Sequence, residues 1–445
     1  MLNSIISLLG KSNKTKTTIK VILVGGFLSV IVRIIGFVKE SAVAYFFGVS
    51  EFVDFYVLGM LFVLFFVQPV GGALATLLTQ KFIEYTQHNS KEFTKHLYLN
   101  CLIFGIICIC MILIIQGCVL QISFFDTWFN NRFKNINLNY IYILIPIGLF
   151  SLISVINGSV LVALRKFKTF TFLPIIIHLS TITFLLFTPK KYLFEGLLIG
   201  TLIGFLLELL ISKICLYDIL KKLKPRFFKE KNKDFKKIIK SMPNMVLSGS
   251  IISGCLIVDQ VMALLAGDGA VAMINFGNRI PLGIISLIAI IWTVLYPNFV
   301  KSASTSDYVS LRKDLVLFSS LSFLLLLPIC VGLSFFSKDL ISVLFEHGAF
   351  LEKNTIVVSN ILTLYLLFIP LFVVSMLCIR VINALEKPNI FLLGSFLLLI
   401  INISLNFYLI PLYGVIGAPL ATLISYIIIT TFWISITHWL LKLPN

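Results

Sequence analysis

Apolar segments of about 20 residues recur along nearly the whole chain, and a helix of that length crosses a hydrocarbon core of about 30 Å. Lipid offers the backbone no hydrogen-bonding partner, so each such segment must fold as a helix. Charged residues make up only 12% of the chain, against about a quarter in a soluble domain. We therefore predict an all-α polytopic membrane protein whose twelve spans lie at 21–46, 55–80, 98–120, 138–163, 170–188, 193–215, 239–266, 270–299, 315–335, 356–384, 389–410 and 414–441.

The net charge of +17 follows the topology of these spans. With the N-terminus inside, most lysines and arginines fall in cytoplasmic tails and loops, as the positive-inside rule requires. This predicts that both termini are cytoplasmic, and it argues against a nucleic-acid partner. The chain then divides into a cytoplasmic tail (1–20), an N-lobe with spans one to six (21–220), a basic cytoplasmic linker (221–238) and a C-lobe with spans seven to twelve (239–445).

The two groups of six spans show an internal repeat with an offset of about 220 residues. "FFGVSEFVDFYVLGMLFVLFFVQP" aligns with "LAGDGAVAMINFGNRIPLGIISLI", which pairs Gly48 with Gly267. A second alignment pairs Ala163 with Ala384. Because six is even, both copies insert the same way up, so a pseudo-two-fold axis along the membrane normal relates the two lobes. Secondary transporters have this architecture, and their substrate site lies between the repeats.

Charged residues within the spans are costly and mark functional sites by default. The basic ones are Arg33, Lys39, Arg279 and Arg380. They outnumber what pairing with a carboxylate such as Glu40 requires, and guanidinium groups bind phosphate bidentately. We therefore predict an anion-binding cavity that contains Arg33, Lys39, Glu40, Arg279 and Arg380. Arg380 lies near a span end, where snorkelling toward the headgroups is the alternative.

One of these arginines lies in a sequence that favours a broken helix. In "GNRIPLG", Pro281 follows Arg279 by two residues and removes a backbone donor from span eight. Discontinuous helices of this kind expose backbone groups to substrates in transporters, although an ordinary proline kink would have the same sequence.

A second polar set lies in the C-terminal half and consists of Asp259, Asn402, Asn406 and Thr422. Their oxygen atoms are hard ligands that suit a small cation such as sodium. The same side chains also join membrane helices by ordinary hydrogen bonds, so spacing leaves both interpretations open. We predict a sodium ion as the possible cofactor and no other.

Five segments, in order along the chain, resemble signature segments of the MurJ (MviN) family: "VRIIGFVKESAVAYFFG", "DFYVLG", "NFGNRIPLG", "LFEHGAF" and "CIRVINALEKP". This family belongs to the multidrug/oligosaccharidyl-lipid/polysaccharide exporter superfamily. Its members flip lipid II, the undecaprenyl-pyrophosphate peptidoglycan precursor, across the inner membrane by alternating access. The resemblance implies that Lys39 and Glu40 match the family's first-span Arg-Asp pair, that Arg33 and Arg279 match two of its arginines, and that the polar set at Asp259 matches its sodium site.

The sequence departs from the family pattern in three places. "GMLF" at 59–62 replaces an arginine of span two, Asn406 replaces an aspartate, and twelve spans are predicted where familiar members have fourteen. The resemblance predicts a flippase for a polyprenyl-pyrophosphate-linked saccharide, most specifically lipid II, in the bacterial inner membrane, acting as a monomer among membrane lipids. An O-antigen or exopolysaccharide repeat unit is the alternative cargo.

Two other functional classes fit the sequence less well. A drug/cation antiporter of the same superfamily needs acidic groups in its N-terminal half, which Arg33 and Lys39 dominate here. A membrane enzyme needs an acidic or metal-binding cluster beside a large outside loop, and the largest such loops offer only scattered candidates, namely Asp126, Asp339, Glu346 and His347. We therefore predict a protein that is not an enzyme.

Overall fold

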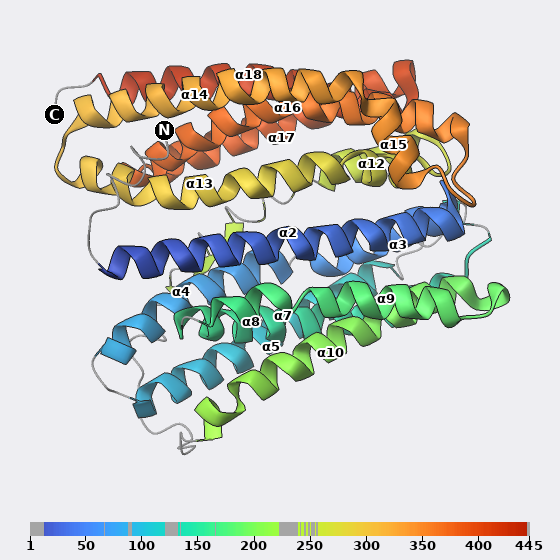
Figure 1. The fold of residues 1–445 in the computed structure, drawn as a ribbon, viewed down its shortest axis with the longest axis horizontal. Helices are drawn as coiled ribbons and strands as arrows, with labels where there is room; N and C mark the ends of the chain where they lie inside the picture. Colours follow the sequence, from blue (N-terminus) through green and yellow to red (C-terminus); the bar gives the residue numbers. More distant parts are fainter. Residues whose placement is uncertain are drawn as a thin grey trace. The chain divides into compact units, whose positions relative to one another are not determined.

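The computed structural model describes residues 13–65, 67–87, 91–120, 132–133, 135–164, 166–221 and 257–442, with scattered positions between 239 and 254. Figure 1 shows helices throughout, and no strand occurs among these residues. Nine segments of the described chain are long and apolar enough to cross a membrane. One of them, Asn389–Leu440, has 52 residues and contains two helices, α17 (Pro388–Tyr413) and α18 (Gly417–Leu440). The all-helical membrane class is thus confirmed.

The chain divides into two compact units whose boundary falls inside the first long helix, α2 (Asn13–Phe47). Unit 1 comprises residues 1–39, 70–122 and 142–243, and unit 2 comprises 40–69, 123–141 and 244–445. The predicted lobe boundaries at 220 and 239, and the twelve-span layout, remain predictions. Much of the basic linker at 221–238 lies outside the described residues.

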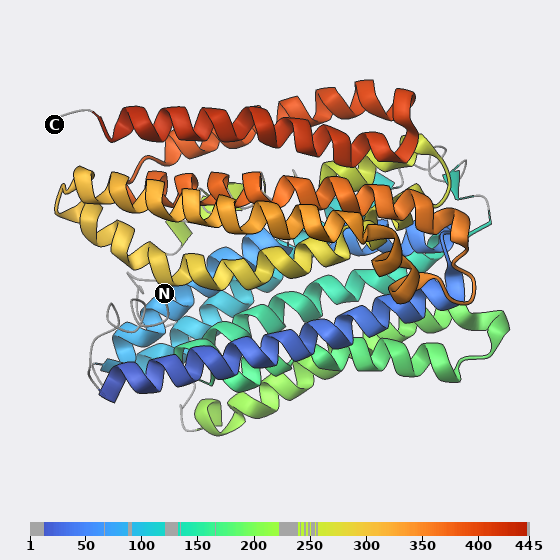
Figure 2. The ribbon, with the colours of Figure 1, turned by 45° about the horizontal axis from the view of Figure 1, so that its top comes forward.

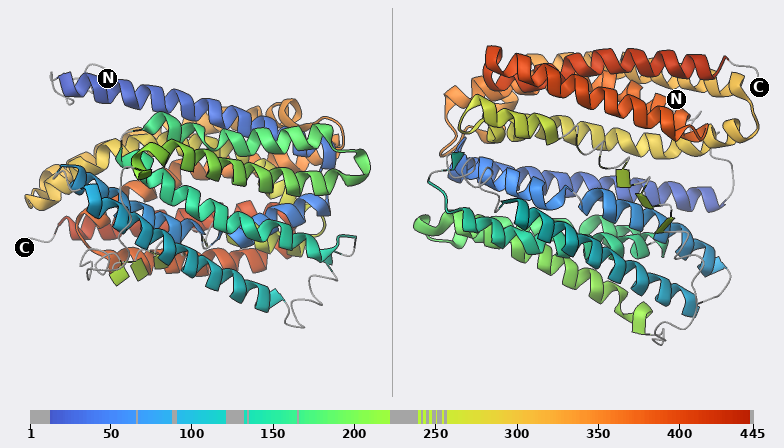
Figure 3. Two further views of the ribbon diagram at one scale, coloured as in Figure 1. Left: turned by 90° about the horizontal axis from the view of Figure 1, so that it is seen from below. Right: turned by 180° about the vertical axis from the view of Figure 1, so that it is seen from behind.

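Unit 1 contains most of α2 and of α4, together with the helices from α5 to α10. Its helix α9 runs alongside α10, as the left panel of Figure 3 shows. Gly200 and Gly204 of α10 lie at this contact, against Thr181 and Ile177 of α9. The helices of the unit are α4 (Val67–Gln87), α5 (Lys91–Leu120), α7 (Ile141–Ala163), α8 (Phe167–Phe172), α9 (Ile175–Phe187) and α10 (Leu193–Lys221).

Unit 2 is organised around α16 (Glu352–Ala384), which packs against α12, α13, α14, α15 and α18. Figure 2 shows α17 and α18 running side by side, in agreement with their packing. The remaining helices are α3 (Glu51–Leu64), α12 (Ala270–Gly277), α13 (Arg279–Ser304), α14 (Tyr308–Phe335) and α15 (Ser337–Phe345).

Two glycines that the predicted repeat aligns both have a positive φ shortly before a helix begins. Gly48, just before α3, has a φ of 57°, and its repeat partner Gly267, just before α12, has a φ of 116°. Residues with a Cβ rarely adopt such angles, so glycine is required for the chain to turn at both places. A Cβ on Gly48 would also collide with the carbonyl of Ala349.

Three of the segments that resemble the MurJ family contact one another in unit 2. The Ser41 hydroxyl donates to the Leu344 carbonyl at 2.6 Å, and the Ala349 amide donates to the Tyr45 carbonyl at 2.8 Å. The Phe276 ring packs against Phe345 and Phe350, with centroids 5.1 and 5.7 Å apart. The turn after α15 therefore fixes the end of α2 and the buried face of α12.

Candidate functional site

Two buried polar clusters lie in unit 2, and each contains residues that the sequence singles out. The first joins α2 to the break between α12 and α13. Arg279 is the first residue of α13, and Asn278 separates the two helices. Pro281 has no N–H to donate to the carbonyl of Gly277, four residues earlier, which accounts for an interruption at this place. The predicted discontinuity is therefore present, with Pro281 inside the first turn of α13.

Arg279 forms an ion pair with Glu40. Its Nη2 atom lies 2.8 Å from Glu40 Oε1 and also donates to Asn275 Oδ1 at 2.7 Å. The amide of Asn275 in turn donates to Glu40 Oε2 at 3.4 Å. Glu40 and Asn275 are buried, with exposures of 4% and 6%. Asn275 therefore connects the two charged residues of the pair. It is not among the predicted site residues, because the sequence marks it only by its position one helical turn before Arg279.

Arg279 keeps hydrogen-bonding capacity beyond this pair. Its Nε atom is buried and has no hydrogen-bond partner in the part of the chain that the structure describes. The side chain is nevertheless 33% exposed, so the guanidinium is not sealed inside the protein. A guanidinium with a remaining donor and an accessible edge can accept an oxyanion without first giving up Glu40.

The other predicted anion-binding residues lie on α2 and α16. Arg33 and Lys39 lie on the part of α2 that belongs to unit 1, where Lys39 is buried and Arg33 is partly exposed. Arg380 lies on α16, and its guanidinium carbon is 5.5 Å from the ring centroid of Tyr296 on α13, which is a cation–π contact. Of the predicted set, the structure brings Glu40 and Arg279 into direct contact.

The second cluster brings together all four residues of the predicted cation site. Asp259 is 5% exposed, and its Oδ1 accepts hydrogen bonds from the amides of Asn402 at 3.2 Å and Asn406 at 3.3 Å. Its Oδ2 accepts from the Thr422 hydroxyl and from the Tyr365 hydroxyl, the latter at 3.0 Å. Tyr365, on α16, is a member that the sequence analysis missed, because no local pattern connects residues 106 positions apart.

The donor set of this cluster suits a small monovalent cation. Asp259 is the only carboxylate among its five members, and none of the ion pairs of the described residues includes it. The Oδ1 atom of Asn406 is buried and has no hydrogen-bond donor in the same described part. This oxygen belongs to the amide whose nitrogen bonds to Asp259, and oxygen atoms of amides and carboxylates are ligands that suit sodium; one cation would neutralise one carboxylate.

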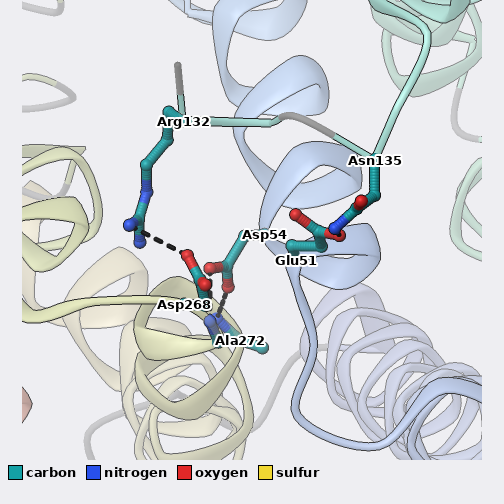
Figure 4. A network of polar contacts seen from close by, with 7 residues as sticks. Glu51, Asp54, Arg132, Asn135, Asp268 and Ala272 are labelled. Atoms are coloured by element: carbon teal, nitrogen blue, oxygen red, sulfur yellow. Dashed lines mark hydrogen bonds and ion pairs between the residues drawn. The ribbon is translucent and has the colours of Figure 1, made fainter. Parts of the chain in front are cut away.

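A third network fixes the N-terminus of α12, the helix that precedes Arg279 (Figure 4). Asp54 of α3 is fully buried, and its two carboxylate oxygens accept the backbone amides of Gly269 and Ala272, each at 2.7 Å. Around it, Arg132 lies 2.9 Å from Asp268, and Asn135 donates to Glu51 at 2.6 Å. An acidic side chain from another helix thus caps α12, where the helix dipole favours negative charge.

Comparisons with known proteins identify the family. A sequence model of the family described as "Lipid II flippase MurJ" matches residues 43–443. The chain is 25% identical over 413 residues to the probable lipid II flippase MurJ of Buchnera aphidicola subsp. Acyrthosiphon pisum, covering 89% of this chain and 79% of that protein. It is 34% identical over 102 residues to the lipid II flippase MurJ of Thermosipho africanus, covering 23% and 22%.

Solved structures show the same fold. An inward closed conformation of lipid II flippase MurJ aligns with a TM-score of 0.70 and 22% identity, covering 94% of this chain and 87% of that one. An inward-facing multidrug resistance MATE transporter of the MOP superfamily aligns with a TM-score of 0.71 and 12% identity, covering 94% and 98%. The family match covers most of the chain, and the chain therefore belongs to the lipid II flippase MurJ family.

Proposed function

We propose that this protein flips lipid II from the cytoplasmic to the periplasmic leaflet of a bacterial inner membrane by alternating access. The family match and the relatives named as lipid II flippases support this cargo. The observation that carries the mechanism is the buried Glu40–Asn275–Arg279 cluster, in which Arg279 is held by a carboxylate and still has a buried donor to offer.

In this mechanism Arg279 binds an oxygen of the pyrophosphate of lipid II. Arg33 and Lys39 supply further positive charge to the same headgroup, as the sequence analysis predicts. Glu40 neutralises Arg279 when no headgroup is bound, so that an isolated charge is never left inside the membrane. Binding therefore adds the pyrophosphate as a second anionic partner of Arg279 beside Glu40, and release of the pyrophosphate leaves the ion pair in place. This cycle moves a lipid without breaking a covalent bond, so we propose no enzymatic activity.

A sodium ion is the proposed coupling ion. It would be held by Asp259, Asn402, Asn406 and Thr422, with Tyr365 closing the site. The positive charge of the ion would neutralise the negative charge of the Asp259 carboxylate. A cation that binds in one state of the transporter and leaves in another shifts the balance between those states by its differential affinity. We further propose a monomer with both termini in the cytoplasm.

The cargo is tested by genetic rescue together with a transport measurement. Expression of this chain should restore growth and cell shape to a bacterial strain depleted of its own MurJ. The purified protein in liposomes should move lipid II between leaflets. If it fails to rescue and moves an undecaprenyl-pyrophosphate-linked O-antigen unit in the liposome assay instead, the lipid II assignment is wrong and the alternative cargo is correct.

A further inference from the structure

Glu208 is a carboxylate in the middle of a membrane span, and neither cluster of the proposed mechanism includes it. It lies on α10, 15 residues after the helix begins at Leu193, within the candidate span Lys190–Tyr217. At 1.5 Å per residue this is about 22 Å from the start of the helix and about 14 Å from Tyr217, so Glu208 lies within the part of the span that crosses a core of about 30 Å. A carboxylate at that depth must be neutralised or protonated, or must face water.

The direct partner of Glu208 is a hydroxyl group. Ser154 of α7 donates a hydrogen bond to the Glu208 carboxylate. One turn further along both helices, the Asn157 amide donates to the Ser212 hydroxyl at 2.8 Å, and the Tyr98 hydroxyl of α5 donates to Asn157 at 2.6 Å. The neighbouring polar groups thus bond to one another, and Ser154 is the one hydrogen-bond partner of Glu208 among the residues that the structure describes.

No basic side chain in the described chain forms an ion pair with Glu208. Several ionisable groups on the surrounding elements contact other residues, are exposed, or lie at other levels of the helices. His178 of α9 lies against Gly36 of α2, and Lys166 donates to the Cys215 carbonyl. The Tyr98 hydroxyl is bonded to Asn157, and Lys213, which lies on α10 like Glu208, is exposed. Tyr142 and Glu195 lie at the first turns of α7 and α10, three or more helical turns from this level.

The second half of the chain shows that packing at this place does not need an acid. In the predicted twelve-span repeat, α7 and α10 are the fourth and sixth spans, and they correspond to α16 and α18, the tenth and twelfth. That pair is joined by two hydroxyls, Ser375 and Thr430, whose oxygens are 2.8 Å apart. The sequence of α18 contains no aspartate or glutamate at all. The same helix contact therefore forms from neutral side chains, and Glu208 is surplus to it.

We propose that Glu208 is a proton-binding site of unit 1, distinct from the cation cluster at Asp259 in unit 2. The carboxylate takes a proton from hydronium, leaving water, and returns it to water on release. A serine hydroxyl suits both states because it donates to the carboxylate and accepts from the carboxylic acid. Glu208 is partly exposed, so the helix pair does not enclose its carboxyl group completely. A role of this proton in driving transport rests on the proposed function. The binding of the proton by Glu208 does not depend on it.

The binding is tested by carbodiimide labelling of the full-length protein in liposomes. Dicyclohexylcarbodiimide reacts with protonated carboxyl groups in apolar surroundings, and peptide mass spectrometry locates the adduct. We expect labelling of Glu208 at acidic pH that declines as the pH rises. Ser154→Ala should shift this decline to higher pH, because the carboxylate loses its donor. Absence of labelling at every pH, or labelling that does not change with pH, would overturn the proposal.

The coupling is tested separately by the pH dependence of lipid II translocation. Glu208→Gln carries a permanently neutral side chain and should flatten the pH profile of transport, while the matched variant Glu195→Gln, on the same helix, should keep the wild-type profile. An unchanged profile in Glu208→Gln would remove the role in coupling. Failure of the wild-type protein to move lipid II would contradict the proposed function and leave the labelling result to stand by itself.

Discussion

Arg279 and Glu40 lie 2.8 Å apart although 239 positions separate them in the chain, and Asn275 bonds to both. An arginine held in this way is neutralised and oriented at the same time. Removing one partner of a buried pair leaves the other charge uncompensated, which costs about 3–5 kcal/mol. The ion pair therefore orients Arg279 for binding, and it also compensates the charge of Glu40 so that Glu40 can remain buried.

Replacement of Arg279 is the first prediction. Arg279→Ala should abolish lipid II translocation, and Arg279→Lys should restore it only in part, because an ammonium cannot contact Glu40, Asn275 and a phosphate in the fixed geometry of a guanidinium. Translocation in liposomes measures the effect, and the amount of protein inserted in the membrane serves as the control. Full activity of the alanine variant would remove Arg279 from the site.

Asn275 should position Arg279 rather than bind the cargo itself. A hydrogen bond to a charged group contributes about 1.5–3 kcal/mol, so Asn275→Ala should slow translocation by about 10- to 100-fold. In a double-mutant cycle with Arg279→Lys the two losses should not add, because the residues share one contact. Strictly additive losses would show that Asn275 acts independently of Arg279.

Sequence patterns predicted the membrane class and several site residues because each depends on local information. Apolar length marks the spans, and Asn402 and Asn406 are one turn apart on one helix, where they bond to each other. Their connection with Asp259 was predicted from the chemistry of their oxygen atoms, and the resemblance to a known family supported it. Tyr365 and Asn275 were missed because membrane spans contain many neutral polar residues, and only the packed structure shows which of them face a charge.

The role of Asp54 as the cap of α12 could not be predicted from its position in the sequence. The sequence marks it only as an acid near the start of span two, whereas the structure shows it capping a helix 215 positions away. Asp54→Ala should lower the free energy of unfolding by about 2 kcal/mol, since two backbone amides at the start of α12 lose their acceptor. Asp54→Asn should retain one of the two bonds and lose about half as much.

Thermal unfolding in detergent measures this loss, and Glu51→Gln is the matched control. Glu51 lies on the same helix and accepts a hydrogen bond from the exposed Asn135 side chain, so its substitution should change the unfolding temperature little. Equal destabilisation by Glu51→Gln and Asp54→Ala would mean that capping of α12 by Asp54 does not contribute the expected free energy of unfolding.

The Asp259 cluster predicts how transport should respond to sodium. Asp259→Asn removes the only carboxylate of the cluster, so sodium should no longer stimulate translocation. Asn406→Asp should place a second carboxylate about 3.3 Å from the first, a distance at which two acids share a proton. Sodium stimulation in that variant should become steeply pH-dependent. Unchanged sodium dependence in Asp259→Asn would show that the ion binds elsewhere.

Glu346 predicts a pH dependence of stability outside the spans. Hydrogen bonds from Thr355, at 2.8 Å, and from Ser342 hold the pKa of this carboxyl below its ordinary value. Because the pKa of Glu346 is lower in the folded protein, its carboxylate contributes fully to stability above the ordinary glutamate pKa. This contribution is lost as the pH falls through the lowered pKa of the folded protein. Thr355→Val should therefore destabilise the protein at neutral pH, and the difference from wild type should shrink in acid. Thermal unfolding at several pH values measures both, with Thr363→Val on the same helix as the control. A difference that stays constant down to acidic pH would mean that Thr355 acts through packing and not through the Glu346 carboxylate.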